Sequence, residues 1–176
     1  TLSFTVPQAQ IESGTVYPFN FPTSSATTGF GSGVFNASDS VTATITAPSG
    51  VIADSNAAAV IMTGNNTNSL TLRGTWTNIN AHLTSTSLTY KPSSLGVTAL
   101  QISIAPDTTV SPNNGYYYNS SNNHWYKYVA STGSAWTSLR VLASATSSFG
   151  THGYLATIAS ASESATAWQA IRAANP

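Results

Sequence analysis

The chain has 176 residues, with five Lys or Arg, five Asp or Glu and no cysteine. A formal net charge of zero excludes a basic face that neutralises phosphates, so nucleic acid is not a predicted partner. The lack of cysteine excludes disulfides and thiolate metal sites, and no apolar run reaches the roughly 18 residues that a membrane span requires.

Alternating segments fill the first part of the chain and predict a mainly β fold. The clearest is 41–46, in which Val, Ala and Ile alternate with Thr. The Gly and Pro turns between such segments favour a β-sandwich. The other strands are predicted at residues 2–6, 15–19, 60–62, 70–72, 87–92 and 100–104.

Two features interrupt this β pattern. Trp76, Ile79 and Leu83 have the spacing of one face of a short helix. The loop before the first clear strand is rich in Gly, Ser and Thr, and we expect Phe30 and Phe35 to anchor it to the core.

The first part also resembles a known family. Residues 70–81 read LTLRGTWTNINA and residues 87–92 read SLTYKP, which is similar to the LTLSGTxxxINAxLxxLTYTP signature of bacterial cadherin-like, immunoglobulin-like adhesin repeats. The resemblance covers residues 1–109. It implies an immunoglobulin-like or cadherin-like β-sandwich of the kind found in tandem in large secreted adhesins.

The same resemblance implies calcium as the candidate cofactor, because such repeats often bind Ca²⁺ with acidic clusters at their junctions. The matching positions here carry Glu12, Asp39 and Asp107. Each is a single acid where the family has two or three, whereas Ca²⁺ takes six to eight oxygen ligands. We therefore expect folding to depend little on calcium.

Residues 110–114 are predicted to be a linker, and residues 115–176 a second, α+β module. An aromatic segment at 116–128 opens this module. A first helix is predicted from a cap at Ser134, with Trp136, Leu139 and Ala143 on its apolar face.

The sequence GYLATI at 153–158 predicts a half-buried strand. Ser160 and Glu163 then have the spacing of a capping box at the start of a second helix. The apolar face of that helix includes Trp168, and we expect Trp136 and Trp168 to be core residues.

In this order, the NGYYY run, the Trp helix, GYLATI and the capping box resemble the N-terminal half of a C-type lectin-like domain, over residues 113–176. The sugar and calcium ligands of that family lie in its other half, so the resemblance transfers no binding residue. It implies that further strands complete the sheet, and we expect residues 115–176 to be completed from outside.

Little in the sequence indicates catalysis. None of the three histidines, His82, His124 and His152, has a metal-ligand partner at i+4 or a carboxylate nearby in sequence. No nucleophile elbow, phosphate-binding Gly loop or zinc-helix motif occurs, so the sequence predicts that the protein is not an enzyme.

Three functions remain open. The first is a structural or adhesive module of an extracellular bacterial surface protein or fibre, partnered by other copies of itself. The second is a carbohydrate-binding module in which Tyr117, Trp125 and Tyr126 stack on surface glycans, although such aromatics more often form a core and a subunit contact. The third is a virion or phage-tail component. The start at Thr1 rather than Met predicts a processed segment, which agrees with an extracellular or cell-surface location.

Overall fold

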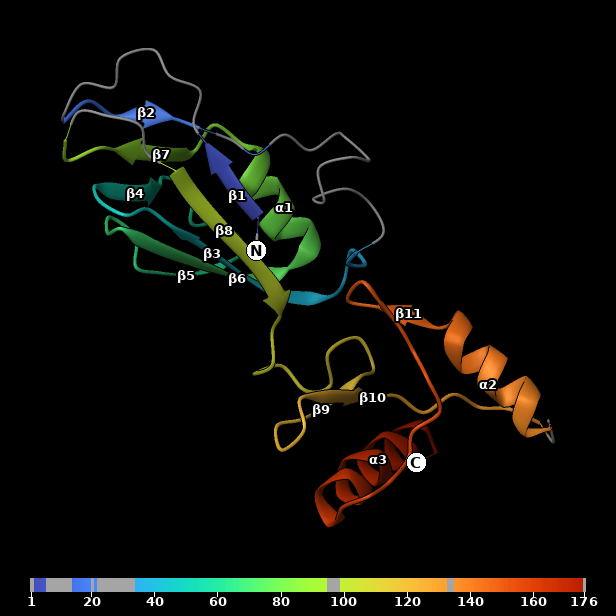
Figure 1. Ribbon diagram of the computed structural model, residues 1–176. Coiled ribbons are helices and arrows are strands. Elements are labelled where there is room, and N and C mark those ends of the chain that lie inside the picture. The colour runs from blue at the N-terminus through green and yellow to red at the C-terminus, as the bar shows by residue number, and fades with distance from the viewer. Residues whose placement is uncertain are drawn as a thin grey trace. The chain divides into compact units, whose positions relative to one another are not determined.

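The computed structural model describes residues 2–5, 14–19, 21, 34–94, 99–132 and 135–175 (Figure 1). The chain divides into two compact units, Thr1–Pro106 and Asp107–Pro176, called unit 1 and unit 2 below. Antiparallel sheets dominate the described residues, so the predicted mainly β class is confirmed.

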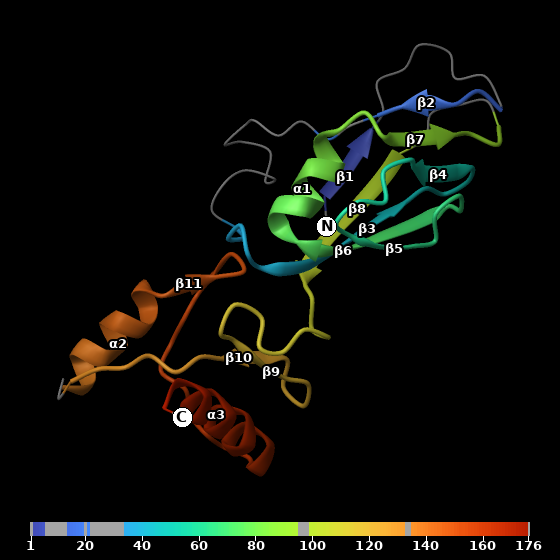
Figure 2. The same ribbon diagram turned by 180° about the vertical axis from the view of Figure 1, so that it is seen from behind.

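The described residues of unit 1 form two antiparallel sheets, which are seen from behind in Figure 2. The five-stranded sheet has the order β1 (Leu2–Thr5), β8 (Ala99–Pro106), β3 (Ser40–Thr46), β6 (Ser69–Thr75) and β5 (Ile61–Thr63). The three-stranded sheet has the order β2 (Tyr17–Pro18), β7 (Leu88–Lys91) and β4 (Val51–Asp54).

β3 is the central strand of the five-stranded sheet, and the burial of its side chains alternates with a strict period of two. It pairs with β6 on one side and with β8 on the other, with Thr44 opposite Thr71 and Ser103. The apolar residues of β3 are fully buried, while its threonines lie on the other face. Both sheets contribute to one hydrophobic core, whose large and fully buried members are Tyr90, Phe21, Ile45, Ile52, Leu70, Leu72, Ile79, Leu83, Leu88, Leu100, Ile102 and Val41.

The predicted helix in unit 1 is confirmed as α1 (Trp76–Thr84). The helix begins directly after Thr75, the last residue of β6. The Thr75 hydroxyl caps it by accepting a hydrogen bond from the Asn78 amide at 3.4 Å. Ile79 and Leu83 point into the core, as their spacing predicts. Phe35 packs against Trp76 with ring centroids 5.4 Å apart, whereas Phe30 lies outside the described residues.

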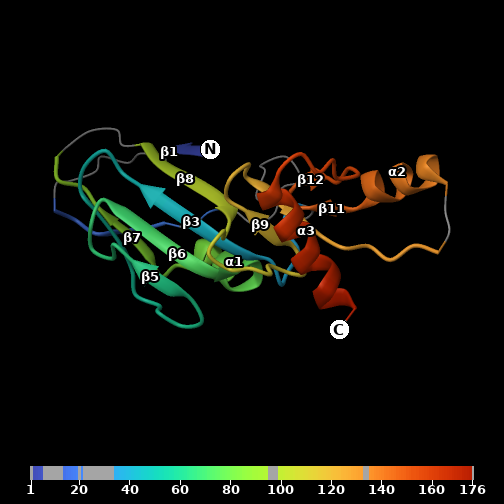
Figure 3. The ribbon, with the colours of Figure 1, turned by 90° about the horizontal axis from the view of Figure 1, so that it is seen from below.

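Unit 2 consists of short elements. The hairpin of β9 (Tyr117–Asn119) and β10 (His124–Tyr126) lies beside α3 (Ala161–Ala174), as Figure 3 shows. The remaining elements are α2 (Trp136–Ala145) and the two-residue strands β11 (Ser147–Ser148) and β12 (Thr151–His152). No helix among the described residues combines the length and the apolar character needed to cross a bilayer.

The predicted cap is found at the start of α3, with the Glu163 carboxylate bonded to the amide of Ala159 in place of the Ser160 amide of a standard capping box. The hydroxyl of Ser160 accepts from the Glu163 amide at 3.1 Å, and the Glu163 carboxylate accepts from the Ala159 amide at 2.8 Å. The cap predicted for α2 at Ser134 lies outside the described residues, and the N-cap position of α2 is Ala135, which provides no side-chain cap.

Two predictions for unit 2 are wrong. Residues 153–159 form no strand, because no described strand lies against them and an extended segment needs a hydrogen-bonded neighbour to become one. Trp136 and Trp168 are not core residues, since their side chains are 64% and 55% exposed. α2, which carries Trp136, buries none of its residues against the described chain. α3 buries Thr166 and Ala170, and Trp168 lies on the opposite face of that helix.

Candidate functional site

The aromatic hairpin of unit 2 has two different faces. Trp125 is paired with Tyr118 and Tyr126 with Tyr117 across the strands. Directly paired residues share a face and neighbours in sequence point to opposite faces. The predicted glycan residues Tyr117, Trp125 and Tyr126 therefore do not form one platform, because Trp125 lies on the opposite face from the other two.

The Trp125 face is a chain of ring contacts. The Trp125 ring centroid lies 4.9 Å from that of Tyr118 and 5.0 Å from that of Phe149. Phe149 in turn contacts Tyr116 at 5.6 Å, and the Lys127 ammonium lies 4.7 Å from the centre of the Tyr116 ring. These rings tie the hairpin to the turn between β11 and β12.

The Tyr126 face attaches the hairpin to α3. Tyr126 is only 8% exposed, and its hydroxyl donates to the Glu163 carboxylate at 2.9 Å. The side-chain amide of Asn122 donates to both groups, at 3.0 Å and 2.9 Å. Glu163 thus caps the helix and also binds the hairpin, a second role that the S-x-x-E spacing alone does not reveal.

The electrostatics of this network follow from its contacts. The hydrogen bond from the Ala159 amide, together with that from the Tyr126 hydroxyl, lowers the pKa of Glu163 below its usual value. Burial, with a further contribution from the Glu163 carboxylate, raises the pKa of Tyr126. Glu163 is therefore a charged acceptor of hydrogen bonds at neutral pH, and Tyr126 is a neutral donor.

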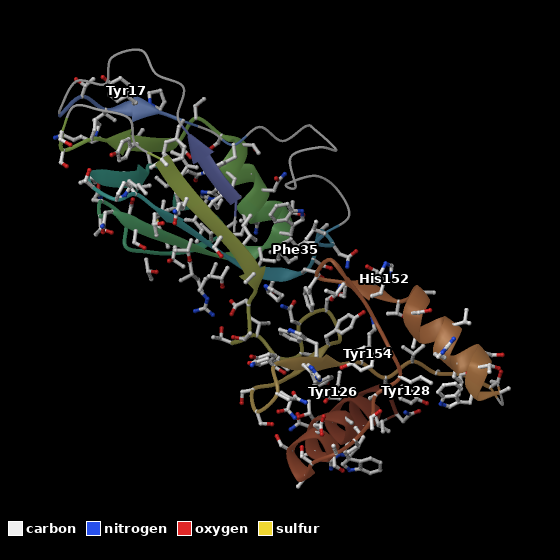
Figure 4. All side chains as sticks on the ribbon, viewed as in Figure 1. Tyr17, Phe35, Tyr126, Tyr128, His152 and Tyr154 are labelled. Carbon is white, nitrogen blue, oxygen red and sulfur yellow. The ribbon has the colours of Figure 1, made fainter. Side chains whose placement is uncertain are left out.

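A cavity of about 820 Å³ opens in unit 2 between β10, α2, the segment 153–157 and α3. Trp125 and Tyr126 line it and Tyr117 does not. Figure 4 shows the side chains of Tyr126, Tyr128 and Tyr154 gathered in this part of unit 2. The apolar part of the lining also includes Val129, Leu139, Leu142, Phe149, Leu155, Ala167, Ala170 and Ile171.

Polar side chains also line the cavity, among them Asn123, His124, Lys127, Ser148, His152 and Glu163. The Tyr154 hydroxyl lies 3.2 Å from Nδ1 of His124, and His152 Nδ1 lies 3.1 Å from the Ser144 carbonyl oxygen. Ser148 is buried in the wall, and its hydroxyl has no hydrogen-bond partner among the described residues. This mixed lining suits a ligand that has an apolar or stacking face together with hydrogen-bonding groups.

The predicted calcium ligands are placed as follows. Asp39 is buried and accepts from the Asn36 amide at 2.8 Å. Asp107 is also buried and accepts from the amide and the hydroxyl of Thr109 at 3.0 Å and 2.7 Å. Glu12 lies outside the described residues, which contain no group of three or more acidic, histidine or cysteine side chains suited to a metal ion. Calcium binding stays a prediction.

Sequence reasoning missed a buried polar pair in unit 1. His82 Nδ1 lies 2.6 Å from the Asp54 carboxylate, and Nε2 lies 2.9 Å from the carbonyl oxygen of Ala58. A carbonyl oxygen only accepts, so Nε2 carries a proton. Both ring nitrogens are engaged, and the pair serves to hold the loop after β4 against α1. The only sequence signal was an acid at the end of an apolar strand, 28 residues from the histidine.

Comparisons with protein-family models, curated proteins and solved structures found no match to this chain. The two family resemblances therefore remain predictions from the residues that carry them.

Proposed function

We propose that the protein is a structural, adhesive module that associates with other copies of itself, in an extracellular bacterial surface protein or fibre. The observation that carries this proposal is that most large apolar side chains of the described part of unit 2 are exposed rather than buried. Among its described residues only two hydrophobic side chains are buried, Tyr126 and Ala170. The large exposed ones are Val110, Tyr128, Val129, Trp136, Val141, Leu142, Tyr154, Ile158 and Trp168.

Such exposure favours association. Monomeric soluble proteins rarely present contiguous apolar patches above a few hundred Å². Fully burying one large apolar side chain is worth about 1.5–3 kcal/mol. A formal net charge of zero adds little repulsion between copies. The resemblance of unit 1 to adhesin repeats supports the extracellular setting.

The test is sedimentation velocity of the full chain over a wide concentration range. Val141 in unit 2 and Ile61 in unit 1 form a matched pair, because they are 64% and 62% exposed. We expect the wild type to associate, Val141→Asp to weaken association at least tenfold, and Ile61→Asp to leave it unchanged. A wild-type chain that stays monomeric at every concentration contradicts the proposal.

A second candidate is carbohydrate binding in the unit 2 cavity. The supporting observation is that Trp125 and Tyr126, from opposite faces of the hairpin, both line the cavity together with the exposed Tyr154. Aromatic rings with polar edges suit stacking against sugars. A glycan array read with Trp125→Ala tests this, with Trp168→Ala as the control because Trp168 does not line the cavity. Binding that is lost only in Trp125→Ala supports it, and no binding by the wild type contradicts it.

A further inference from the structure

We propose that residues 153–159 pair antiparallel with the same residues of a second copy, about a two-fold axis at Ala156. This inference rests on the proposed self-association and assigns the surface that performs it. The segment runs extended from β12 to α3 in Figure 1.

The backbone of this segment is fixed at both ends and open between them. The Gly153 amide donates to the Thr146 carbonyl at 2.7 Å, and the Ala159 amide donates to Glu163 at 2.8 Å. A Cβ at position 153 would lie 2.7 Å from the Ala143 carbonyl oxygen, so glycine permits this close approach. Among the described residues, residues 154–158 have no backbone hydrogen-bond partner. Such open edges recruit strands.

The segment is also complementary to itself. With Ala156 on the axis, Tyr154 lies opposite Ile158 of the second copy, and Leu155 lies opposite its Thr157. Tyr154 and Ile158 are 65% and 46% exposed. Pairs of an aromatic with a β-branched residue stabilise antiparallel strands, and a two-fold axis forms each pair twice.

Charge permits this pairing. Residues 153–159 contain no charged side chain. The titratable groups closest to the segment include His152, Glu163 and His124, whose Nδ1 lies 3.2 Å from the Tyr154 hydroxyl. The register places His152 opposite Ser160 of the second copy. Glu163 is already engaged by Tyr126 and Asn122, so like charges do not meet across the axis.

The exposed apolar area of unit 2 is close to what a dimer requires. Its large exposed side chains present about 680 Å², taking roughly 200 Å² for an aromatic and roughly half as much for an aliphatic side chain. A standard interface buries about 800 Å² per partner. The segment alone is too small, so the other exposed apolar side chains of unit 2, Val141 among them, belong to the same interface.

The experiment uses the absence of cysteine from the chain. Ala156→Cys in the full chain places two thiols on the axis, within reach of a disulfide in paired strands. Under oxidised glutathione we expect the majority of this variant to form a covalent dimer. Ser164→Cys is the control, because Ser164 is exposed on α3 and lies outside the pairing. It should give at least tenfold less covalent dimer than Ala156→Cys.

The register is tested by mixing Leu155→Cys with Thr157→Cys. We expect the mixture to cross-link better than either variant alone, because these positions face each other across the axis. Hydrogen exchange of the wild type adds a readout that needs no substitution. Amides within 154–158 should slow at least tenfold as concentration rises through the association range.

The outcomes separate this inference from the proposed function. A wild type that stays monomeric overturns both. A wild type that associates while Ala156→Cys cross-links no better than Ser164→Cys, and while amides 154–158 exchange at a constant rate, overturns the strand pairing alone. The strand pairing alone is also overturned if exchange of those amides slows only when a glycan or a foreign peptide is added.

Discussion

Removal of the Asp54 carboxylate should lower the free energy of unfolding of unit 1 far more than a substitution on its surface. The carboxylate holds His82 at 2.6 Å, and both side chains are almost fully buried. It also accepts from the Asn56 amide at 2.8 Å. Asp54→Leu leaves one buried ring nitrogen without a partner, and breaking a buried pair in this way costs about 3–5 kcal/mol.

Two variants separate the lost pair from the altered packing. Asp54→Asn keeps an acceptor for Asn56, and its amide can donate to Nδ1 of His82, so we expect it to cost about 1–2 kcal/mol. The double variant Asp54→Leu with His82→Phe removes both polar partners. It should cost less than the sum of the two single variants by about 2 kcal/mol or more.

Native-state hydrogen exchange of the β3 amides in the full chain is the suitable assay, because β3 is paired on both sides and reports the global opening of unit 1. A cost of about 3–5 kcal/mol accelerates exchange by roughly two to four powers of ten. The reasoning would be refuted if Asp54→Leu and Asp54→Asn each lowered the unfolding free energy equally and by less than about 1 kcal/mol, since the pair would then contribute nothing to stability.

Three further predictions concern unit 2 and the metal. Trp136→Ala should change the stability of the monomer by less than about 1 kcal/mol because the ring is exposed, while lowering association measured by sedimentation. The Glu163 pKa is depressed in the fold, so its stabilisation is complete above the usual carboxyl range and is lost as pH falls through the lowered pKa. The protection factors of the α3 amides, which correct for slower intrinsic exchange in acid, should therefore fall as pH falls, and Glu163→Gln should remove this pH dependence. Millimolar Ca²⁺ should move the melting midpoint by less than about ten degrees relative to a chelator, and a larger shift would support a calcium junction at Asp39 or Asp107.

The sequence by itself determined the features whose cause is local. The strict alternation of 41–46 predicted β3, and the spacing of Ile79 and Leu83 predicted α1. The S-x-x-E spacing predicted the cap of α3, because its two hydrogen bonds join groups within four residues. Composition and alternation together were enough to predict a mainly β chain.

Only the tertiary structure decided what depends on distant neighbours. It joined Asp54 to His82, and it placed Trp125 on the opposite hairpin face from Tyr126. It also left GYLATI unpaired and the helix tryptophans exposed. An apolar periodicity states which face of a segment can be buried, but burial requires a partner surface, and that surface comes from other parts of the chain or from another molecule.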